Sequence, residues 1–464
     1  MLDLERLLAE RGTERLDLIA ECVNPVFARV LRTLGYDIPF VQGRGQYLWD
    51  EAGHRYLDCI GGFGTFACGR NHPKIRQVIK QAMDLDLPNL PKFAPPALSG
   101  LLAEKLIAVA PGDLDTVYFC NSGAEAIETA IKYARCATSR PRMVYCHKAY
   151  HGLTLGALSI NGGQEFREGF EPIPGHTTPI PFNDLTALEC ELNRGDVAGF
   201  VVEPVQGKGV FVPDDDYLPA AADLCRRHGA LFVADEVQTG FGRTGRMFAC
   251  DHWGVEPDIL CAAKALSGGY VPCAAVLTRR WIHRKVFSRL DRVVVHSTTF
   301  GQNDLAMAAG LATLDVLQEE QIVENAAAMG RRLITGLRDL ADEFDLVQEV
   351  RGLGLMVGVE LGPPTGLALK MGWKLLHRID AGLFPQAVLI PLLQDHRVLA
   401  LVAGHQMDVI KLLPALVIDE QDVDHLISAL RTTIQACYRF PGPVWEITRR
   451  LSGLALRSAD HTSS

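Results

Sequence analysis

Short apolar runs, each ending near a polar residue or a glycine, recur through the middle of the chain and predict strands buried on both faces of a sheet. Stretches with a helical period, such as Glu125–Ala137 and Tyr217–Arg227, lie between them. This alternation predicts an α/β fold with a large, mostly parallel sheet that is covered on both sides. The predicted strands are Thr116–Cys120, Met143–Tyr145, Gly199–Glu203, Leu231–Ala234, Ile259–Ala263 and Val293–His296.

The two ends of the chain have other patterns. Phe40–Leu57 alternates around glycine-containing turns and predicts a small antiparallel unit, while residues 304–344 have a helical period. The C-terminal part predicts a smaller α+β domain, built from Val347–Glu360, a helix Gly366–Ala381, strands Ala387–Ile390, Val398–Val402 and Ile410–Leu412, and a helix Glu420–Ala436. The predicted divisions are an N-terminal helical segment at 1–35, the first part of the small domain at 36–80, the large domain at 81–330, the rest of the small domain at 331–440 and a fraying tail at 441–464.

Composition and charge narrow the function classes. The chain has 464 residues, of which 48% are hydrophobic and 22% charged, as in ordinary globular enzymes. Its net charge of −9 argues against nucleic-acid binding or a polybasic membrane surface. The 12 cysteines are scattered without metal-ligand spacing, so we expect no metal site and a reducing compartment.

Neither a membrane span nor a targeting segment is predicted. No apolar run approaches the roughly 20 residues that cross a bilayer. The N-terminus has apolar residues at helical spacing but is rich in Asp and Glu, which fits an amphipathic helix that packs on the body or on a partner subunit rather than a signal peptide. The expected location is cytoplasmic.

Charged side chains close three of the predicted strands. Leu231–Ala234 is followed by Asp235, Ile259–Ala263 by Lys264, and Gly199–Glu203 ends on a carboxylate. Ligands of open α/β sheets bind outside the carboxyl ends of the strands, so these residues are candidates for a site. The pattern alone also allows a structural ion pair between Asp235 and Lys264.

Small residues follow another predicted strand. Ser122, Gly123 and Ala124 stand between Thr116–Cys120 and a helix, where free N–H groups and the helix dipole suit a phosphate, although Ser122 is equally an ordinary N-cap. Together with the aromatic Tyr150, two carboxylates and a lysine, this cup meets the needs of pyridoxal phosphate. That cofactor takes a lysine amine on its aldehyde, a carboxylate on its ring nitrogen and N–H donors on its phosphate.

These segments resemble the class III aminotransferases of the pyridoxal-phosphate fold-type I superfamily, from about Pro39 to Leu430, and most of all their putrescine-type, amine-accepting branch. The segments that carry the resemblance are FCNSGAEA (119–126), AYHG (149–152), VVEPVQG (201–207), LFVADEVQTGFGRTG (231–245), PDILCAAKALSGG (257–269) and HSTTFGQN (296–303). The resemblance implies the superfamily's fold, with a large cofactor-binding domain and a smaller α+β domain, and a homodimer with active sites at its interface.

Residue roles follow from the same resemblance. Lys264 would form the Schiff base and shuttle the proton, with Asp235 on the ring nitrogen and Glu203 completing the catalytic set. The implied cofactor contacts are Ser122, Gly123 and Ala124 on the phosphate, Tyr150 stacked on the ring, Gln238 on the ring hydroxyl and Thr299 reaching the phosphate from the neighbouring subunit. Phe63, in the glycine-rich stretch 60–69, would lie near the substrate mouth.

Two lysines depart from the family pattern. Many members hold a substrate carboxylate with an arginine, and neutralise it with a glutamate five positions after the glutamate of the E-P-x-Q motif. Here Lys208 stands at the glutamate position and Lys411 at the arginine position. A lysine is a point charge without the bidentate fork, so carboxylate docking should be looser, and two lysines in one pocket would repel. The alternative is that Lys208 points to solvent and Lys411 lies along the surface.

The apolar stretch Leu383–Gly404 is expected to add apolar surface near the same pocket. We therefore expect an aminotransferase for a terminal amine or aldehyde with an apolar or extended body, working with a 2-oxo acid or small aldehyde. An ornithine or acetylornithine type of transaminase, a biosynthetic enzyme for a lipid-like or polyketide-like aldehyde, other reactions of the same scaffold and a cofactor-free binding protein remain open.

Overall fold

In the computed structural model of the chain, the described residues are 1–90, 94–379, 382–439, 442, 444 and 446. The predicted tail at 441–464 therefore lies almost wholly outside the described residues, as does Ala381, the predicted end of one helix. None of the helices that the structure describes is long and apolar enough to cross a membrane.

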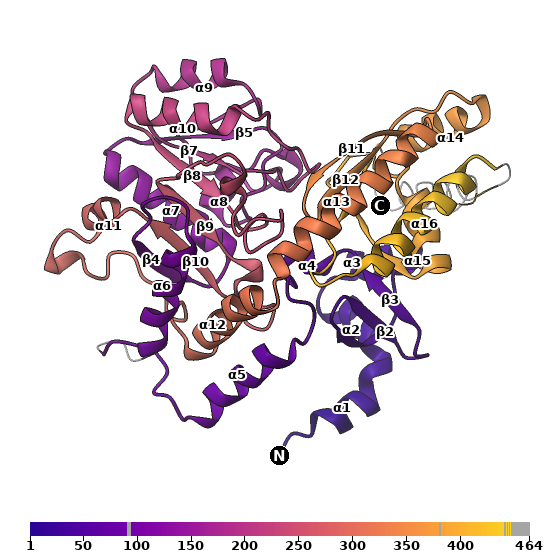
Figure 1. Cartoon of the computed structure of the whole chain (residues 1–464), viewed down its shortest axis with the longest axis horizontal. Coiled ribbons are helices and arrows are strands. Elements are labelled where there is room, and N and C mark those ends of the chain that lie inside the picture. Colours follow the sequence, from indigo (N-terminus) through magenta and orange to yellow (C-terminus); the bar gives the residue numbers. More distant parts are fainter. Residues whose placement is uncertain (91–93, 380–381, 440–441, 443, 445, 447–464) are drawn as a thin grey trace, which may run out of the picture.

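A seven-stranded sheet dominates the described part of the chain (Figure 1). All its neighbours run parallel except β10, which is antiparallel to both β4 and β9, so the prediction of a mostly parallel sheet is confirmed. In order across the sheet, the strands are β4 (Thr116–Cys120), β10 (Ala274–Thr278), β9 (Ile259–Ala262), β8 (Leu231–Asp235), β7 (Val197–Val202), β5 (Arg142–Cys146) and β6 (Thr177–Ile180).

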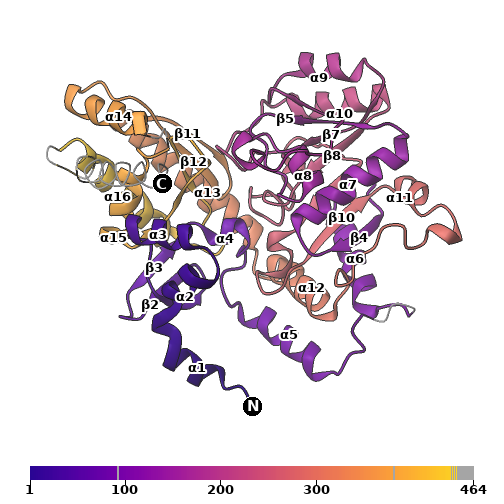
Figure 2. The ribbon, with the colours of Figure 1, turned by 180° about the vertical axis from the view of Figure 1, so that it is seen from behind.

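Apolar side chains pack on both faces of this sheet, as continuous apolar strands require. Val201 and Val233 point to one face, where they pack with the buried face of α7. Phe200 and Phe232 point to the other, toward α10. Figure 2 shows α7 across the first face, with α9 and α10 beyond the second. The associated helices are α6 (Ala97–Val109), α7 (Gly123–Thr138), α8 (Leu155–Ser159), α9 (Leu185–Leu192), α10 (Tyr217–His228), α11 (Arg280–Val286) and α12 (Asp304–Glu319).

The ends of the chain meet in two four-stranded sheets beside the large one. One has the order β1, β2, β3, β13 and the other β11, β12, β15, β14. Their strands are β1 (Phe40–Arg44), β2 (Tyr47–Asp50), β3 (Arg55–Asp58), β11 (Val347–Leu353), β12 (Met356–Leu361), β13 (Val398–Leu399), β14 (Leu401–Val402) and β15 (Val409–Leu412). The predicted domain boundaries stay a prediction.

The predicted strand Val398–Val402 divides between these two sheets. Val398 and Leu399 pair parallel to β3, whereas Leu401 and Val402 pair antiparallel to β15. Ala400 therefore lies where the chain passes from one sheet to the other. The helices around them are α1 (Leu4–Arg11), α2 (Arg15–Cys22), α3 (Pro25–Leu34), α4 (Gly61–Gly64), α13 (Ile322–Glu343), α14 (Leu367–Ile379), α15 (Gln386–His396) and α16 (Glu420–Cys437), while α5 (Pro73–Asp84) packs against α12.

Two predicted strands are wrong. Ala387–Ile390 belongs to the helix α15, although that helix contains Pro391. Val293–His296 follows a short 3-10 turn, and Val293 and Val294 are 58% and 71% exposed, so no neighbouring strand or core buries this run. Short 3-10 turns occur at Gly12–Glu14, Gln164–Phe166, Ala249–His252, Lys264–Ser267 and Leu290–Arg292.

The expectation for Leu383–Gly404 is wrong for most of that stretch. Phe384, Val388 and Leu389 are buried in the main apolar core and do not enlarge a pocket wall. The amphipathic segment at the N-terminus, residues 1–23, forms the two helices α1 and α2 with a 3-10 turn between them rather than one helix, and α1 buries none of its residues.

Candidate active site

A cavity of about 830 Å³ opens at the carboxyl ends of the large sheet and is closed on its other side by the smaller sheets. The turns after β4, β5, β7, β8 and β9 reach it from the large sheet, as expected for a parallel arrangement. The residues after α4, together with β14 and β15, reach it from the other side. Of the 12 predicted site residues, 11 line this cavity, and Thr299 does not.

Lys264 is the second residue after β9 and begins a 3-10 turn. Its φ of +44° is in the left-handed region, a strained conformation for a residue with a side chain, and such strain concentrates at functional sites. Among the residues that the structure describes, none makes a hydrogen bond or ion pair with its amine. Burial lowers the pKa of Lys264 below its ordinary value, against the opposing effect of Asp235 and Glu203.

Asp235, the last residue of β8, is 4% exposed and is held by two contacts. One carboxylate oxygen lies 2.7 Å from His151 Nδ1, and the other accepts the Val237 N–H at 3.1 Å. Burial disfavours a charged imidazole, but the hydrogen bond to Asp235 and the negative charges of Asp235 and Glu203 together outweigh it, so the pKa of His151 is raised. No ion pair joins Asp235 to Lys264, so the structural pair left open by the sequence is not formed among the described residues.

Glu203 follows β7 and is also buried, at 5% exposure. Its two carboxylate oxygens accept the N–H groups of Tyr150, at 2.9 Å, and Gly207, at 2.7 Å. Burial raises the pKa of Glu203 in spite of these bonds. Glu203 therefore ties together the turns that follow β5 and β7.

The predicted phosphate cup lies at the N-terminus of α7, a helix of 16 residues. Ser122 is its N-cap, and the hydroxyl accepts the Glu125 N–H at 3.2 Å, so the capping alternative describes the Ser122 side chain in this structure. The cup has little room: a Cβ on Gly123 would lie 2.8 Å from a methyl of Val237. A Cβ on Gly152 would lie 2.7 Å from that of Ala124, so this glycine lets the Tyr150 loop approach the cup.

Aromatic side chains form the mouth of the cavity. Tyr150 packs edge-on against Phe166, with ring centroids 5.4 Å apart. Phe63 is 59% exposed, and its carbonyl accepts the side-chain N–H of Gln238 at 2.9 Å. Phe63 thus lies at the cavity and Gln238 bridges to it.

Both unusual lysines line the cavity, at 8% exposure for Lys208 and 4% for Lys411, so the surface alternative is wrong. The ammonium of Lys208 pairs with Glu165 and lies 4.3 Å from the ring centre of Phe166. The amine of Lys411 donates to Gln238 Oε1 at 2.6 Å and to the carbonyl of Gly207. The expected mutual repulsion is therefore relieved on one side, because Glu165 balances Lys208.

Thr299 is exposed and belongs to a segment outside the cavity of this single chain. Its neighbour Thr298 accepts the side-chain N–H of Asn121 at 2.9 Å, which holds the segment near the start of the cup. The predicted reach of Thr299 to a partner's phosphate stays a prediction.

Sequence reasoning gave no role to His151 or Arg243. His151 is buried against Asp235, and its Nε2 has no hydrogen-bond partner among the described residues. Arg243 is 1% exposed and donates to the carbonyls of Leu355 and Pro414, while its Nε and Nη2 have no partner in the described chain. His151 follows the predicted site residue Tyr150 in a glycine-containing loop, and this position could have indicated a role for it. Nothing in the sequence around Arg243 indicates that its side chain is buried.

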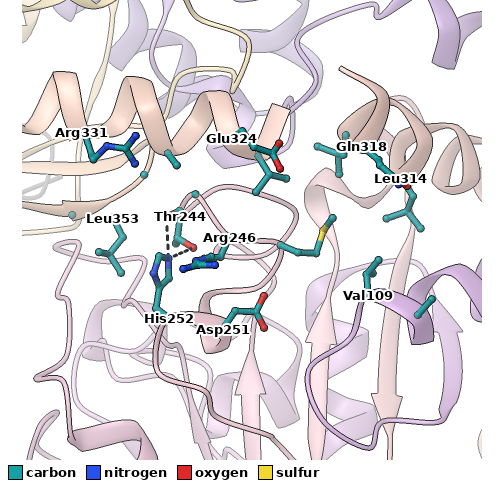
Figure 3. Close-up of a pocket in the computed structure, with 18 of the residues that line it drawn as sticks. Val109, Thr244, Arg246, Asp251, His252, Leu314, Gln318, Glu324, Arg331 and Leu353 are labelled. Atoms are coloured by element: carbon teal, nitrogen blue, oxygen red, sulfur yellow. Dashed lines mark hydrogen bonds between the residues drawn. The ribbon is translucent and has the colours of Figure 1, made fainter. Parts of the chain in front are cut away.

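A larger cavity of about 1070 Å³ lies elsewhere, between α6, α12, α13 and the turn that carries Thr244 and Arg246 (Figure 3). None of the predicted site residues lines it. Two of its polar groups are paired locally, since His252 Nε2 contacts the Thr244 carbonyl at 3.0 Å and Lys105 pairs with Asp315. The smaller cavity, with its buried carboxylates and unpartnered lysine amine, is therefore the better candidate for chemistry.

The donor set of the smaller cavity fits pyridoxal phosphate. Lys264 offers an amine with no partner in the described chain, and Asp235 is a buried carboxylate braced by His151. The N-terminus of α7 offers N–H groups to an anion. No group of three or more His, Cys, Asp or Glu side chains in the described residues is arranged to hold a metal ion.

Comparison with known proteins points the same way. Residues 33–434 match the family described as "Aminotransferase class-III". The chain is 40% identical to a putrescine aminotransferase of Pectobacterium atrosepticum, over 76% of this chain and 78% of that protein. It is 33% identical to the aminotransferase PigE of a Serratia species over 90% of this chain, but it spans only about half, 53%, of that protein's length.

A solved structure has the same fold. The amine transaminase of an uncultivated Pseudomonas species, in its form with bound pyridoxal phosphate, superposes with a TM-score of 0.75 at 29% identity. The match covers 86% of this chain and 94% of that one.

Proposed function

Because the chain belongs to the class III aminotransferase family, we propose that it transfers an amino group from a terminal amine to a 2-oxo acid or small aldehyde by a ping-pong mechanism. The amine is a diamine or one with a long or apolar body. The carrying observation is the meeting of Lys264, Asp235, Glu203 and the N-terminus of α7 in one cavity whose mouth is aromatic.

Class III aminotransferases use pyridoxal 5′-phosphate, which when bound supplies an aldehyde for the amine and an electron-withdrawing ring. In the proposal, Lys264 holds the cofactor covalently and then moves a proton at its Nζ. A lowered pKa suits that work, because a base must be neutral to accept a proton. Asp235 holds the positive ring nitrogen, and His151 fixes the carboxylate in place.

The other predicted contacts complete the cofactor site. Ser122, Gly123 and Ala124 hold the phosphate through the N-terminus of α7, with its unpaired N–H groups and its dipole. Tyr150 and Gln238 line the same cavity, where Tyr150 would stack on the ring and Gln238 would contact the ring hydroxyl. Glu203 keeps the Tyr150 backbone in position through its hydrogen bond.

The proposal of an amine substrate rests on the residues that line the cavity and on the proteins similar to this chain. Apart from the cofactor residues and the basic side chains, the cavity wall includes Phe63, Phe166, Val271 and the apolar stretch 401–403, which suits a substrate with an apolar body. A putrescine aminotransferase and an amine transaminase are among the proteins similar to this chain.

We also propose a homodimer in which Thr299 of each subunit completes the cofactor site of the other. Val293, Val294 and Phe300, around this residue, are 58%, 71% and 59% exposed. A run of exposed apolar residues next to a cofactor site supports a covering subunit. Light scattering of the purified protein tests the oligomeric state. A monomer that binds the cofactor and has full activity would refute the proposed homodimer.

Half-reactions of the holoenzyme test the substrate class. Putrescine, hexylamine, ornithine and acetylornithine are mixed singly with the protein, and the visible absorption of the bound cofactor is followed. The two simple amines should remove that absorption, and Lys264→Ala serves as the unreactive control. If only ornithine or acetylornithine removed the absorption of the bound cofactor, the proposed preference for simple amines would be refuted and an ornithine or acetylornithine type of transaminase favoured.

A further inference from the structure

The carboxylates that line the active-site cavity, among the residues that the structure describes, are Glu203 and Asp235, and both are already engaged. Asp235 contacts His151 and accepts the Val237 N–H, and Glu203 accepts two backbone N–H groups. Both stand at the carboxyl ends of the large sheet, where the cofactor is proposed to bind. The wall formed by Phe166 and residues 401–405 therefore offers a substrate no carboxylate from the described part of the chain.

The ammonium of Lys208 lies at this wall. A Cβ on Gly404 would lie 3.6 Å from Lys208 Cγ, so the lysine stem runs beside the apolar stretch 401–403. Lys208 is 8% exposed, and its ammonium pairs with Glu165. Because Lys208 lines the cavity and Glu165 does not, the positive end of this ion pair faces the substrate.

The aromatic ring beside Lys208 does not offset that charge for an incoming cation. Lys208 Nζ lies 4.3 Å from the ring centre of Phe166, which is a cation–π distance, so this ring already holds one ammonium. The other basic residues along the same wall are His405 and Lys411. A second cation that entered this region would meet like charge, carboxylates that are engaged elsewhere and a ring that is already occupied.

We propose that Lys208, held in place by Glu165, is a specificity-determining residue that selects amines with a single charged group over diamines. This inference rests on the proposed function and narrows the amine named there to one with an uncharged body. At pH 8 the distal amine of a diamine is protonated, because an alkyl amine has a pKa of about 10. Lys208 repels that charge, whereas an uncharged alkyl chain packs beside the lysine stem and the apolar stretch 401–403. A diamine still reacts, but with a lower kcat/KM.

Two amines of equal length test this selection. Hexylamine and 1,5-diaminopentane differ only in ending in a methyl or an ammonium group. Each is mixed with the holoenzyme at pH 8, and the second-order rate constant for loss of the visible absorption of the bound cofactor is measured. Hexylamine should react about 10- to 100-fold faster, because juxtaposed like charges are costly. Both amines are measured on the same protein, so differences in folding or cofactor content cancel in the ratio of the two rate constants.

Substitutions of Lys208 should change that ratio. Lys208→Met removes the ammonium and leaves the Glu165 carboxylate unpaired, so the preference should shift about 10- to 100-fold toward the diamine. Lys208→Gln, which can still donate a hydrogen bond to Glu165, should shift it less in the same direction and keeps the test valid should Lys208→Met fail to fold. Lys105→Met, the matched control, frees Asp315 outside this cavity and should leave the ratio unchanged.

Each possible failure of this test has its own meaning. A ratio that is unchanged in the Lys208 variants, or a wild-type enzyme that prefers the diamine, would overturn the selection by Lys208 and leave the proposed function intact. Reaction of the wild-type holoenzyme with neither amine would refute the proposed function, and the selection with it.

Discussion

Replacing Lys411 by methionine should stabilise the folded enzyme, and most strongly at low pH. Methionine has a similar length and no charge, so it removes the burial cost of the ammonium. The pKa of Lys411 falls from 10.5 to about 7 on folding. At about 1.36 kcal/mol per unit, the ammonium costs roughly 5 kcal/mol below pH 7 as an upper bound.

The pH dependence gives the prediction its sign. Between pH 7 and 10.5 the unfolded chain holds the lysine proton and the folded chain does not, so wild-type stability rises with pH relative to Lys411→Met. The advantage of methionine should therefore shrink by about 3 kcal/mol from pH 6 to pH 9. With an unfolding entropy of about 2 cal/mol/K per residue, that is a change of about 3 °C in the difference between the two midpoints.

Differential scanning fluorimetry of both proteins in their cofactor-free form, in which Lys264 keeps its free amine, measures that difference at pH 6, 7, 8 and 9. The hydrogen bonds lost with Lys411 change the stability difference by the same amount at each pH, so they do not affect how that difference varies with pH. Lys208→Met is the control, because its ammonium is paired with Glu165 and its removal should destabilise the protein. A Lys411→Met advantage that is constant with pH, or that grows as pH rises, would refute the burial argument.

Three further outcomes are expected at the cofactor site. Lys264→Ala should lower turnover by about 10²- to 10⁴-fold. Borohydride reduction should no longer attach the cofactor covalently to the variant chain. Covalent attachment in Lys264→Ala would contradict the proposed role of Lys264. Gly123→Ala places a Cβ 2.8 Å from a Val237 methyl, so the affinity for the cofactor, measured by fluorescence titration, should fall. The double substitution Gly123→Ala/Val237→Ala removes that methyl and should restore the affinity. An unchanged affinity in Gly123→Ala would show that the cup does not need this space. Thr299→Ala should weaken cofactor binding about 10- to 100-fold, because it removes a charge-assisted hydrogen bond to the phosphate. Ser297→Ala, two positions earlier in the same segment, is the control and should leave the affinity unchanged. Equal losses of affinity in the two variants would argue against a specific contact by Thr299.

The large sheet and most of its site could be predicted because buried parallel strands leave a plain signal. Each apolar run ends at the same edge of the sheet, so Asp235 and Lys264 had to come near one another wherever the strands lay in order. The identity of the cofactor then followed from the chemistry of the meeting side chains.

Short apolar runs outside that sheet carry no such signal. Ala387–Ile390 is continuous in its apolar character, which suits a buried strand and a buried helix equally, and Pro391 further argued against the helix that forms. Val293–Val295 has β-branched residues without a partner to pair with. Local pattern cannot show which of these runs finds a neighbour.

The partners of the charged side chains were also beyond the sequence. Glu165, in the 3-10 turn Gln164–Phe166, pairs with Lys208 43 residues later, and Arg243 donates to the carbonyls of Leu355 and Pro414, 112 and 171 residues away. The first pairing depends on how the turns after β5 and β7 approach each other, and the second on how the smaller sheets pack against the large one; residue spacing predicts neither.

The passage of the chain at Ala400 has a consequence for synthesis on the ribosome. β3 ends at Asp58, but β13, which pairs with it, begins at Val398, about 340 residues later. At about 5 to 20 residues per second, the edge of β3 waits about 20 to 70 s for its partner strand to emerge. Until then, the β3 edge of the β1–β2–β3 unit lacks its partner strand, and an unpaired strand edge is a template for pairing with another chain.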